Sequence, residues 1–173
     1  AMTWTTAELG SDFKVAADIA GDKILEAVDP VISYLLMDCP YELYWFDKTI
    51  GYQFSYDFVQ RGETYSISRL SFQFVVASEY RAADMFTVDA AKVGGVKKAA
   101  DNAKAIVTKH EGKSDYEKLA AYCQEICDLV SYYDEAAEDA YMPYGNPWQM
   151  VWVFDGDPTT NVVCEGYAKA FQY

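Results

Sequence analysis

The residues best suited to covalent chemistry in this chain surround Cys164. Val162 and Val163 are β-branched and favour an extended segment, whereas the residues from Cys164 onward are good helix formers. A cysteine at such a junction occupies a helix N-terminus, where unpaired backbone N–H groups and the helix dipole favour the thiolate. The pattern therefore predicts a nucleophilic thiol. The alternative is a buried cysteine that begins an ordinary core helix.

The segment 163–168, Val-Cys-Glu-Gly-Tyr-Ala, resembles the nucleophile motif of the bacterial transglutaminase-like superfamily, a branch of the papain-like thiol enzymes. Two other segments also resemble that family. Residues 38–46 (Asp-x-Pro-x-Glu-Leu-x-Trp-Phe) are similar to the region that precedes the catalytic domain, and 114–134 are similar to the first helix of the core. The resemblance implies that Cys164 opens the central helix and attacks amide carbonyls.

In that family a His and an Asp follow the cysteine, but the only histidine here, His110, precedes Cys164. We interpret His110 as a solvated residue at a helix end and not as a catalytic base. We therefore expect the chain to be the N-terminal part of a larger enzyme. The missing His and Asp, and with them a partner, would come from the remaining C-terminal part of the same protein, and this chain alone would be inactive.

A peptide or protein is the expected substrate, and the acceptor decides the reaction. Water would give a peptidase, and a lysine amine would give a cross-linking transglutaminase; the residues of this chain leave both open. The rival interpretation is a non-catalytic protein-binding or cell-wall-binding module with a structural Cys164.

Further residues are candidates for lining the site. In papain-like enzymes a Gln or Trp upstream of the nucleophile joins the cysteine's own N–H in stabilising the oxyanion. The resemblance suggests Gln149 or Trp148 for that role, with Gly166 also lining the site. The alternative for Gln149 and Trp148 is ordinary core packing.

No cofactor and no metal are expected. Cys123 and Cys127 share one helical face at i, i+4 spacing, but a zinc site needs two more ligands, so we expect both in the core. Residues 155–161 carry oxygen side chains at alternate positions, as calcium loops do. The sixth position is Thr160 where such loops need Gly, and the twelfth is Gly166 where they need Glu, which favours a solvated turn.

A net charge of −13 disfavours binding to nucleic acid phosphates. No apolar run approaches the roughly 18 residues that span a membrane. The four cysteines are too few and too scattered for a disulfide scaffold. No signal peptide is visible in this chain, so the residues do not define the compartment, and only the family resemblance favours an extracellular or cell-surface bacterial location.

The periodicity predicts an α+β fold, in which N-terminal helices and an antiparallel hairpin lead into the first half of a papain-like core. Residues 11–38 are expected to be helical, with Asp29-Pro30 restarting the helix as cap and first residue. Alternating aromatic and polar residues predict two strands, 51–59 and 65–76, joined by a turn.

Two more helices are expected in the second half of the chain. One spans 89–110, with a break favoured by its glycine pair, and the other begins at a capping box formed by Ser114 and Glu117. Residues 135–145 are expected to form an acidic loop. The domains expected are 1–87, the helical and hairpin region, and 88–173, the start of the transglutaminase-like core.

Overall fold

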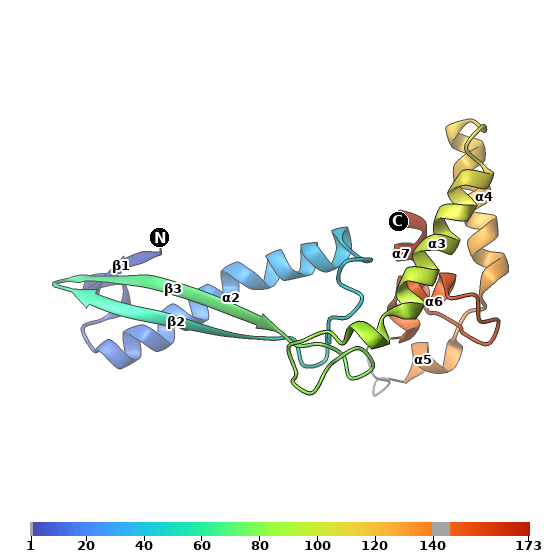
Figure 1. Cartoon of the computed structure of the whole chain (residues 1–173). Helices are drawn as coiled ribbons and strands as arrows, with labels where there is room; N and C mark the ends of the chain where they lie inside the picture. The colour runs from blue at the N-terminus through green and yellow to red at the C-terminus, as the bar shows by residue number, and fades with distance from the viewer. Residues whose placement is uncertain (1, 140–145) are drawn as a thin grey trace. The chain divides into compact units, whose positions relative to one another are not determined.

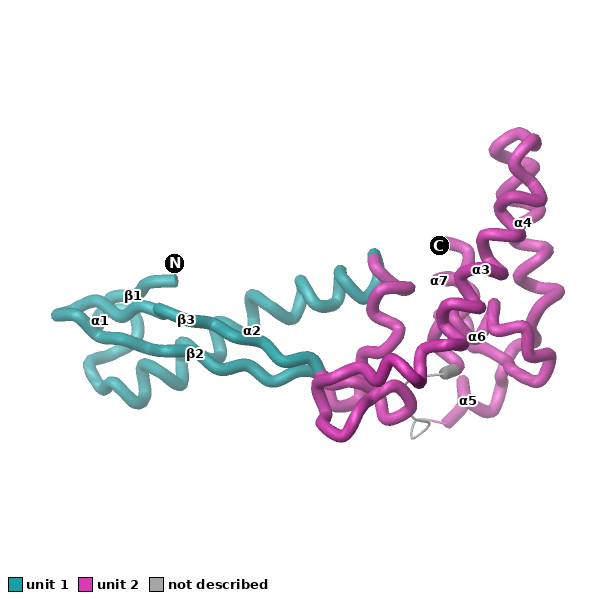
Figure 2. The backbone as a smooth tube through the Cα atoms, viewed as in Figure 1, with its two compact units in different colours: residues 1–38, 52–74 teal, residues 39–51, 75–173 magenta. Residues whose placement is uncertain are grey.

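The structure is a computed structural model that describes residues 2–139 and 146–173 (Figure 1). Contacts within the chain define two compact units, shown in separate colours in Figure 2. Unit 1 is Ala1–Asp38 with Tyr52–Phe74, and unit 2 is Cys39–Gly51 with Val75–Tyr173. The expected domain boundary at residue 87 stays a prediction, because compact units defined by contacts are not the same as domains.

Unit 1 contains a three-stranded antiparallel sheet with the strand order β1-β3-β2. Its elements are β1 (Thr3–Thr5), α1 (Thr6–Leu9), α2 (Phe13–Asp38), β2 (Tyr52–Arg61) and β3 (Thr64–Phe74). The predicted hairpin is confirmed as β2 and β3. Its turn places Gly62 at φ 60°, a left-handed conformation that glycine adopts without strain. The edge strand β1 was not predicted.

The helix α2 runs through Pro30 without a break, so the predicted restart at Asp29-Pro30 is wrong. The carboxylate of Asp29 does not act as a helix cap. It accepts a hydrogen bond of 2.5 Å from the Tyr52 hydroxyl on β2. A proline inside a helix removes one backbone hydrogen bond, which is why a break was predicted. The contact between Asp29 and Tyr52 joins distant segments, so a rule that considers only neighbouring residues does not detect it.

The core of unit 1 forms where α1 and α2 meet the sheet. Tyr65 is fully buried there, among Leu9, Ala16 and Ala20. Its hydroxyl donates to the carbonyl of Gly10 at 2.9 Å, so the buried polar group has a partner.

Unit 2 is mainly helical. Its elements are the 3₁₀ helix η1 (Ala90–Lys92), α3 (Gly94–Lys109), α4 (Asp115–Leu129), α5 (Asp134–Glu138), the 3₁₀ helix η2 (Asn146–Trp148), α6 (Val151–Phe154) and α7 (Cys164–Gln172). The predicted helix 89–110 is interrupted at Val93, next to the glycine pair. The capping box of Ser114 and Glu117 is confirmed. The first part of the expected acidic loop is the helix α5, and the part at 140–145 lies outside the described residues.

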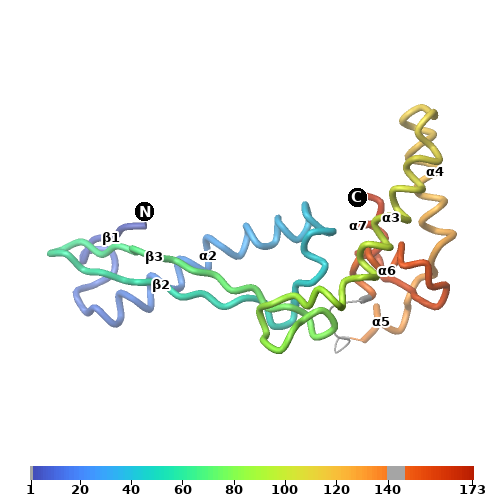
Figure 3. The backbone as a smooth tube through the Cα atoms, in the orientation of Figure 1, coloured from blue at the N-terminus to red at the C-terminus, as the bar shows by residue number. Residues whose placement is uncertain are grey.

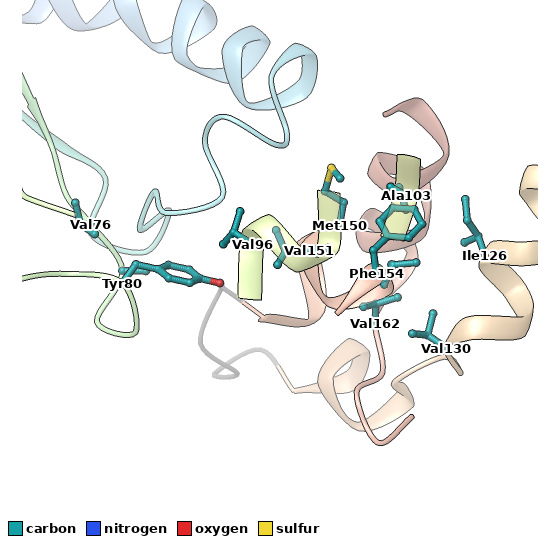
Figure 4. Close-up of a cluster of buried hydrophobic side chains, with 14 residues drawn as sticks. Val76, Tyr80, Val96, Ala103, Ile126, Val130, Met150, Val151, Phe154 and Val162 are labelled. Carbon is teal, nitrogen blue, oxygen red and sulfur yellow. The ribbon is translucent and has the colours of Figure 1, made fainter. Parts of the chain in front are cut away.

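The core of unit 2 gathers side chains from α3, α4, α6 and the segments before α7 (Figure 4). Met150 and Val162 are fully buried in it. Figure 3 traces α6 and α7 beside α3, and the amide of Asn102 on α3 donates to the last carbonyl of α6, on Phe154, at 2.7 Å. Helices and a small antiparallel sheet make the chain α+β; a papain-like core stays a prediction.

Candidate active site

Cys164 is the first residue of α7, and it is exposed. The residue before it, Val163, has an extended backbone with φ −92° and ψ 178°. The N–H groups of a first helical turn have no acceptor within their own helix, and the positive end of the helix dipole lies there. The predicted helix start at Cys164 is therefore confirmed. The alternative of a buried cysteine does not describe this thiol.

The 3₁₀ helix η2 contacts the main chain of the residue that precedes Cys164. The Val163 N–H donates to the carbonyl of Pro147 at 2.8 Å. The same carbonyl lies against Gly166, where an added Cβ would come within 2.9 Å of the Pro147 oxygen and 2.7 Å of the Val162 Cβ. Real Cβ atoms do not approach neighbours that closely, so the packing here requires glycine. The structure thus brings η2, Cys164 and Gly166 together through the main chain.

A second segment, 130–133, fixes α7 from the end of α4. Val162 and Tyr132 form a parallel β-bridge. The Tyr167 hydroxyl donates to the carbonyl of Val130 at 2.8 Å, and its ring stacks on that of Tyr132 with the ring planes 10° apart. Burial raises the pKa of Tyr167, and the nearby Cys127 adds to this. The first two turns of α7 are therefore held on two sides.

An ion cluster lies directly after the cysteine. One carboxylate oxygen of Glu165 lies 2.5 Å from the Lys48 ammonium and 2.5 Å from the Lys169 ammonium. Lys48 comes from the segment Cys39–Gly51, whereas Lys169 is one turn along α7. Burial lowers the pKa of Lys48 to about 8; the hydrogen bond to Glu165 opposes this, and the charge of Lys169 adds to it. The cluster ties the first turn of α7 to a distant part of the chain.

Sequence reasoning missed this cluster. The i, i+4 spacing of Glu165 and Lys169 could have predicted their ion pair, since such residues are neighbours on a helix surface. No local signal points to Lys48, which is 117 residues away from Glu165.

Trp148 is the last residue of η2 and Gln149 follows it, on the segment whose Pro147 carbonyl accepts a hydrogen bond from Val163. The Gln149 side chain makes its own contacts within unit 2. Its amide N–H donates to the carbonyl of Tyr44 at 2.5 Å, and its oxygen accepts from the Tyr80 hydroxyl at 3.4 Å. A glutamine amide carries two N–H groups, so at most one is left to stabilise an oxyanion.

His110 is 7% exposed, so its interpretation as a solvated residue is wrong. It ends α3, and its Nε2 lies 2.9 Å from a carboxylate oxygen of Glu125 on α4, which also pairs with Lys109. Its ring meets the ring of Tyr122, also on α4, edge to face. Lys109 and then His110 lower the pKa of Glu125. These contacts connect His110, at the end of α3, to α4.

Cys123 and Cys127 are both exposed, so the expectation that they lie in the core is wrong. On α4, Ile126 is the residue that is buried. In the segment that resembled a calcium loop, Asp157 accepts hydrogen bonds from the backbone and hydroxyl of Thr159, as in a simple turn. Across 2–139 and 146–173, no group of three or more His, Cys, Asp or Glu side chains is placed to hold a metal.

An apolar groove of about 630 Å³ lies between α3, α4 and the last turn of α7. Val107, Leu119 and Phe171 line it, and each is about half exposed. Its α7 side is formed by residues 170–173, at the opposite end of that helix from Cys164. The described helices include none that is long and apolar enough to cross a membrane.

Comparison with protein-family models, with curated proteins and with solved structures finds no match for this chain. The similarity to transglutaminase-like enzymes therefore rests on the motif residues around Cys164 and the two upstream segments, and it stays a prediction.

Proposed function

We propose that Cys164 is the nucleophile of a thiol-dependent acyl-transfer reaction at amide bonds, in a transglutaminase-like peptidase or cross-linking enzyme. The observation that carries this proposal is the exposed thiol on the first residue of α7. A nine-residue helix directs its dipole at that position. The hydrogen bond between Val163 and Pro147 holds the backbone there, which is what a nucleophile needs for a fixed direction of attack.

In the proposed reaction the Cys164 thiolate attacks the carbonyl carbon of an amide, so that an S–C bond forms and the carbonyl π electrons move onto oxygen. N–H groups of the first turn of α7 would stabilise this oxyanion, with one N–H of Gln149 or the indole N–H of Trp148 as a further donor. The C–N bond then breaks, and the amine leaves with the proton that an imidazole had taken from the Cys164 thiol. Water or a lysine amine finally attacks the thioester carbonyl and gives a proton to the imidazole, and the S–C bond breaks to return the thiolate.

The base in this mechanism is not assigned to His110. That side chain is buried and bonded to Glu125 in the α3–α4 hairpin. We therefore propose that a His and an Asp from outside the residues of this chain complete the site. The family resemblance favours a peptide or protein substrate, hydrolysis over cross-linking, and an extracellular or cell-surface setting.

Differential alkylation of the four cysteines tests the assignment of Cys164. The folded chain is treated with limiting iodoacetamide at pH 6–7, and the labelled peptides are quantified by mass spectrometry over time. Cys123 and Cys127 are matched controls, because both are exposed like Cys164 but lie inside α4 and not at a helix start. We expect Cys164 to be alkylated several-fold faster than either, because only it lies at the positive end of a helix dipole.

A rate for Cys164 no higher than that of the α4 cysteines would contradict the nucleophile assignment. It would favour the alternative of a binding module with a structural thiol. Unfolding in urea before alkylation supplies the reference, because all four thiols should then react at similar rates.

A further inference from the structure

Cys123 and Cys127 form a pair of exposed thiols on α4. They are one helical turn apart, so both side chains lie on the same face of α4. The core packing expected for them would have explained their spacing, but neither is buried. Two soft ligands therefore lie side by side on the surface of one continuous helix.

A disulfide between them does not fit an intact helix. Residues at i, i+4 on a helix have Cβ atoms about 5–6 Å apart, whereas a disulfide needs Cβ atoms about 3.5–4.5 Å apart. Closing that gap would distort α4, which is continuous from Asp115 to Leu129. A metal ion between the two sulfur atoms lengthens the bridge and removes this conflict.

The number of ligands selects the metal. Structural zinc takes four protein ligands, and in the described part of the chain no third His, Cys, Asp or Glu completes a group with this pair. Thiolates select soft ions such as Cu(I), and Cu(I) also accepts two-coordinate sites. We propose that Cys123 and Cys127 form a two-thiolate site for one Cu(I) ion.

Binding of Cu(I) deprotonates both thiols. Both S–H bonds break, the two protons go to solvent, and two S–Cu bonds form while copper stays in the +1 state. The bound site carries one negative charge, where the two protonated thiols carried none, and it lies on a chain of net charge −13, which attracts cations in general. This site is separate from the function proposed for Cys164 and does not depend on it.

The test uses the full chain, reduced and kept free of oxygen, in a Cys39→Ser/Cys164→Ser background that leaves only the α4 pair. Cu(I) is supplied as its coloured bicinchoninate complex, and the loss of colour reports transfer to the protein. We expect one Cu(I) per chain. Adding Cys123→Ser or Cys127→Ser should abolish this stoichiometric transfer, and circular dichroism checks that each variant keeps its helical content.

Copper K-edge X-ray absorption of the loaded background then counts the ligands, and two sulfur scatterers are expected. The proposal is overturned if the background takes no copper from bicinchoninate, or if either single serine variant takes as much as the background. It is also overturned if one Cu(I) is shared by two chains, or if Zn(II) binds as tightly with four ligands.

Discussion

The carbonyl oxygen of Pro147 accepts a hydrogen bond of 2.8 Å from the N–H of Val163, the residue that precedes Cys164. The same oxygen lies against Gly166 one turn further on. One backbone carbonyl thus locates both the start of α7 and its first turn. A main-chain hydrogen bond therefore helps to set the position of the thiol.

Replacing Gly166 by alanine should destabilise the chain by about 1–3 kcal/mol, the usual cost of overpacking a filled site. The new Cβ would come within 2.9 Å of the Pro147 oxygen, a backbone atom that cannot rotate away. Urea unfolding followed by circular dichroism measures the effect. Because α7 would shift, alkylation of Cys164 should also slow.

The matched control is Gly95→Ala in α3, where an added Cβ meets nothing within 4 Å. There alanine should leave stability unchanged or raise it by up to about 1 kcal/mol, through its better helix propensity. Equal effects at the two glycines would contradict the close packing at Gly166.

The titration of Lys48 should respond in opposite directions to its two charged neighbours. Its pKa, lowered to about 8 mainly by burial, is raised by Glu165 and lowered further by Lys169. We therefore expect Lys169→Met to raise the pKa of Lys48 and Glu165→Gln to lower it. NMR of ¹³C-labelled lysine side chains measures both shifts, and a change of the same sign in both variants would refute the cluster.

Lys48 should also affect the pH dependence of stability. Lysine in an unfolded chain has a pKa of about 10.4. Between a pH of about 8 and that value, Lys48 therefore holds its proton in the unfolded chain but has lost it in the folded chain. The contribution of this group to the free energy of unfolding therefore rises with pH in that window, and it is lowest below it. In Lys48→Met, urea unfolding from pH 7 to 9.5 should lack this rise.

Tyr167→Phe should lower the free energy of unfolding by about 1 kcal/mol, the net contribution of a typical hydrogen bond. The substitution removes the bond from the hydroxyl to the Val130 carbonyl, which connects α7 to the end of α4. Tyr116→Phe is the control, because Tyr116 is 81% exposed. Urea unfolding compares the two variants, and an equal loss in both would mean that the bond contributes nothing.

Acid should weaken the α3–α4 hairpin through Glu125. Lys109, and then His110, lower the pKa of this carboxyl. The contribution of Glu125 to stability is thus fully present when the pH is above its pKa in the unfolded chain. It is lost as the pH falls through its lower pKa in the folded chain. Glu125→Gln should therefore lose less stability than the wild type between pH 6 and pH 3 in urea titrations. The control Glu138→Gln, at an exposed position, should follow the wild type.

Local patterns predicted the elements whose causes are local. The alternation of aromatic and polar residues predicted β2 and β3, and Ser114 with Glu117 predicted the start of α4. The change from β-branched residues to helix formers predicted that α7 begins at Cys164. In each case the deciding residues lie within one turn or one strand of each other.

Contacts between distant segments explain what could not be predicted. The carboxylate of Asp29 bonds to Tyr52 and does not cap a new helix at Pro30. The edge strand β1 depends on pairing with β3, some sixty residues later. Lys48 reaches Glu165 only in the folded chain. The exposure of Cys123 and Cys127 likewise depends on which helices cover α4, and periodicity alone does not give that.

Unit 2 is not continuous in the sequence, because it includes Cys39–Gly51 as well as Val75–Tyr173. This limits how the unit could be exchanged between proteins. The segment supplies Phe46, which pairs with Val76, and Lys48, which pairs with Glu165. A recombination event at one junction, such as before Val75, would deliver unit 2 without these partners. Gene fusion or shuffling would therefore have to carry the hairpin of unit 1 along with it, as an insertion inside the unit that holds the thiol.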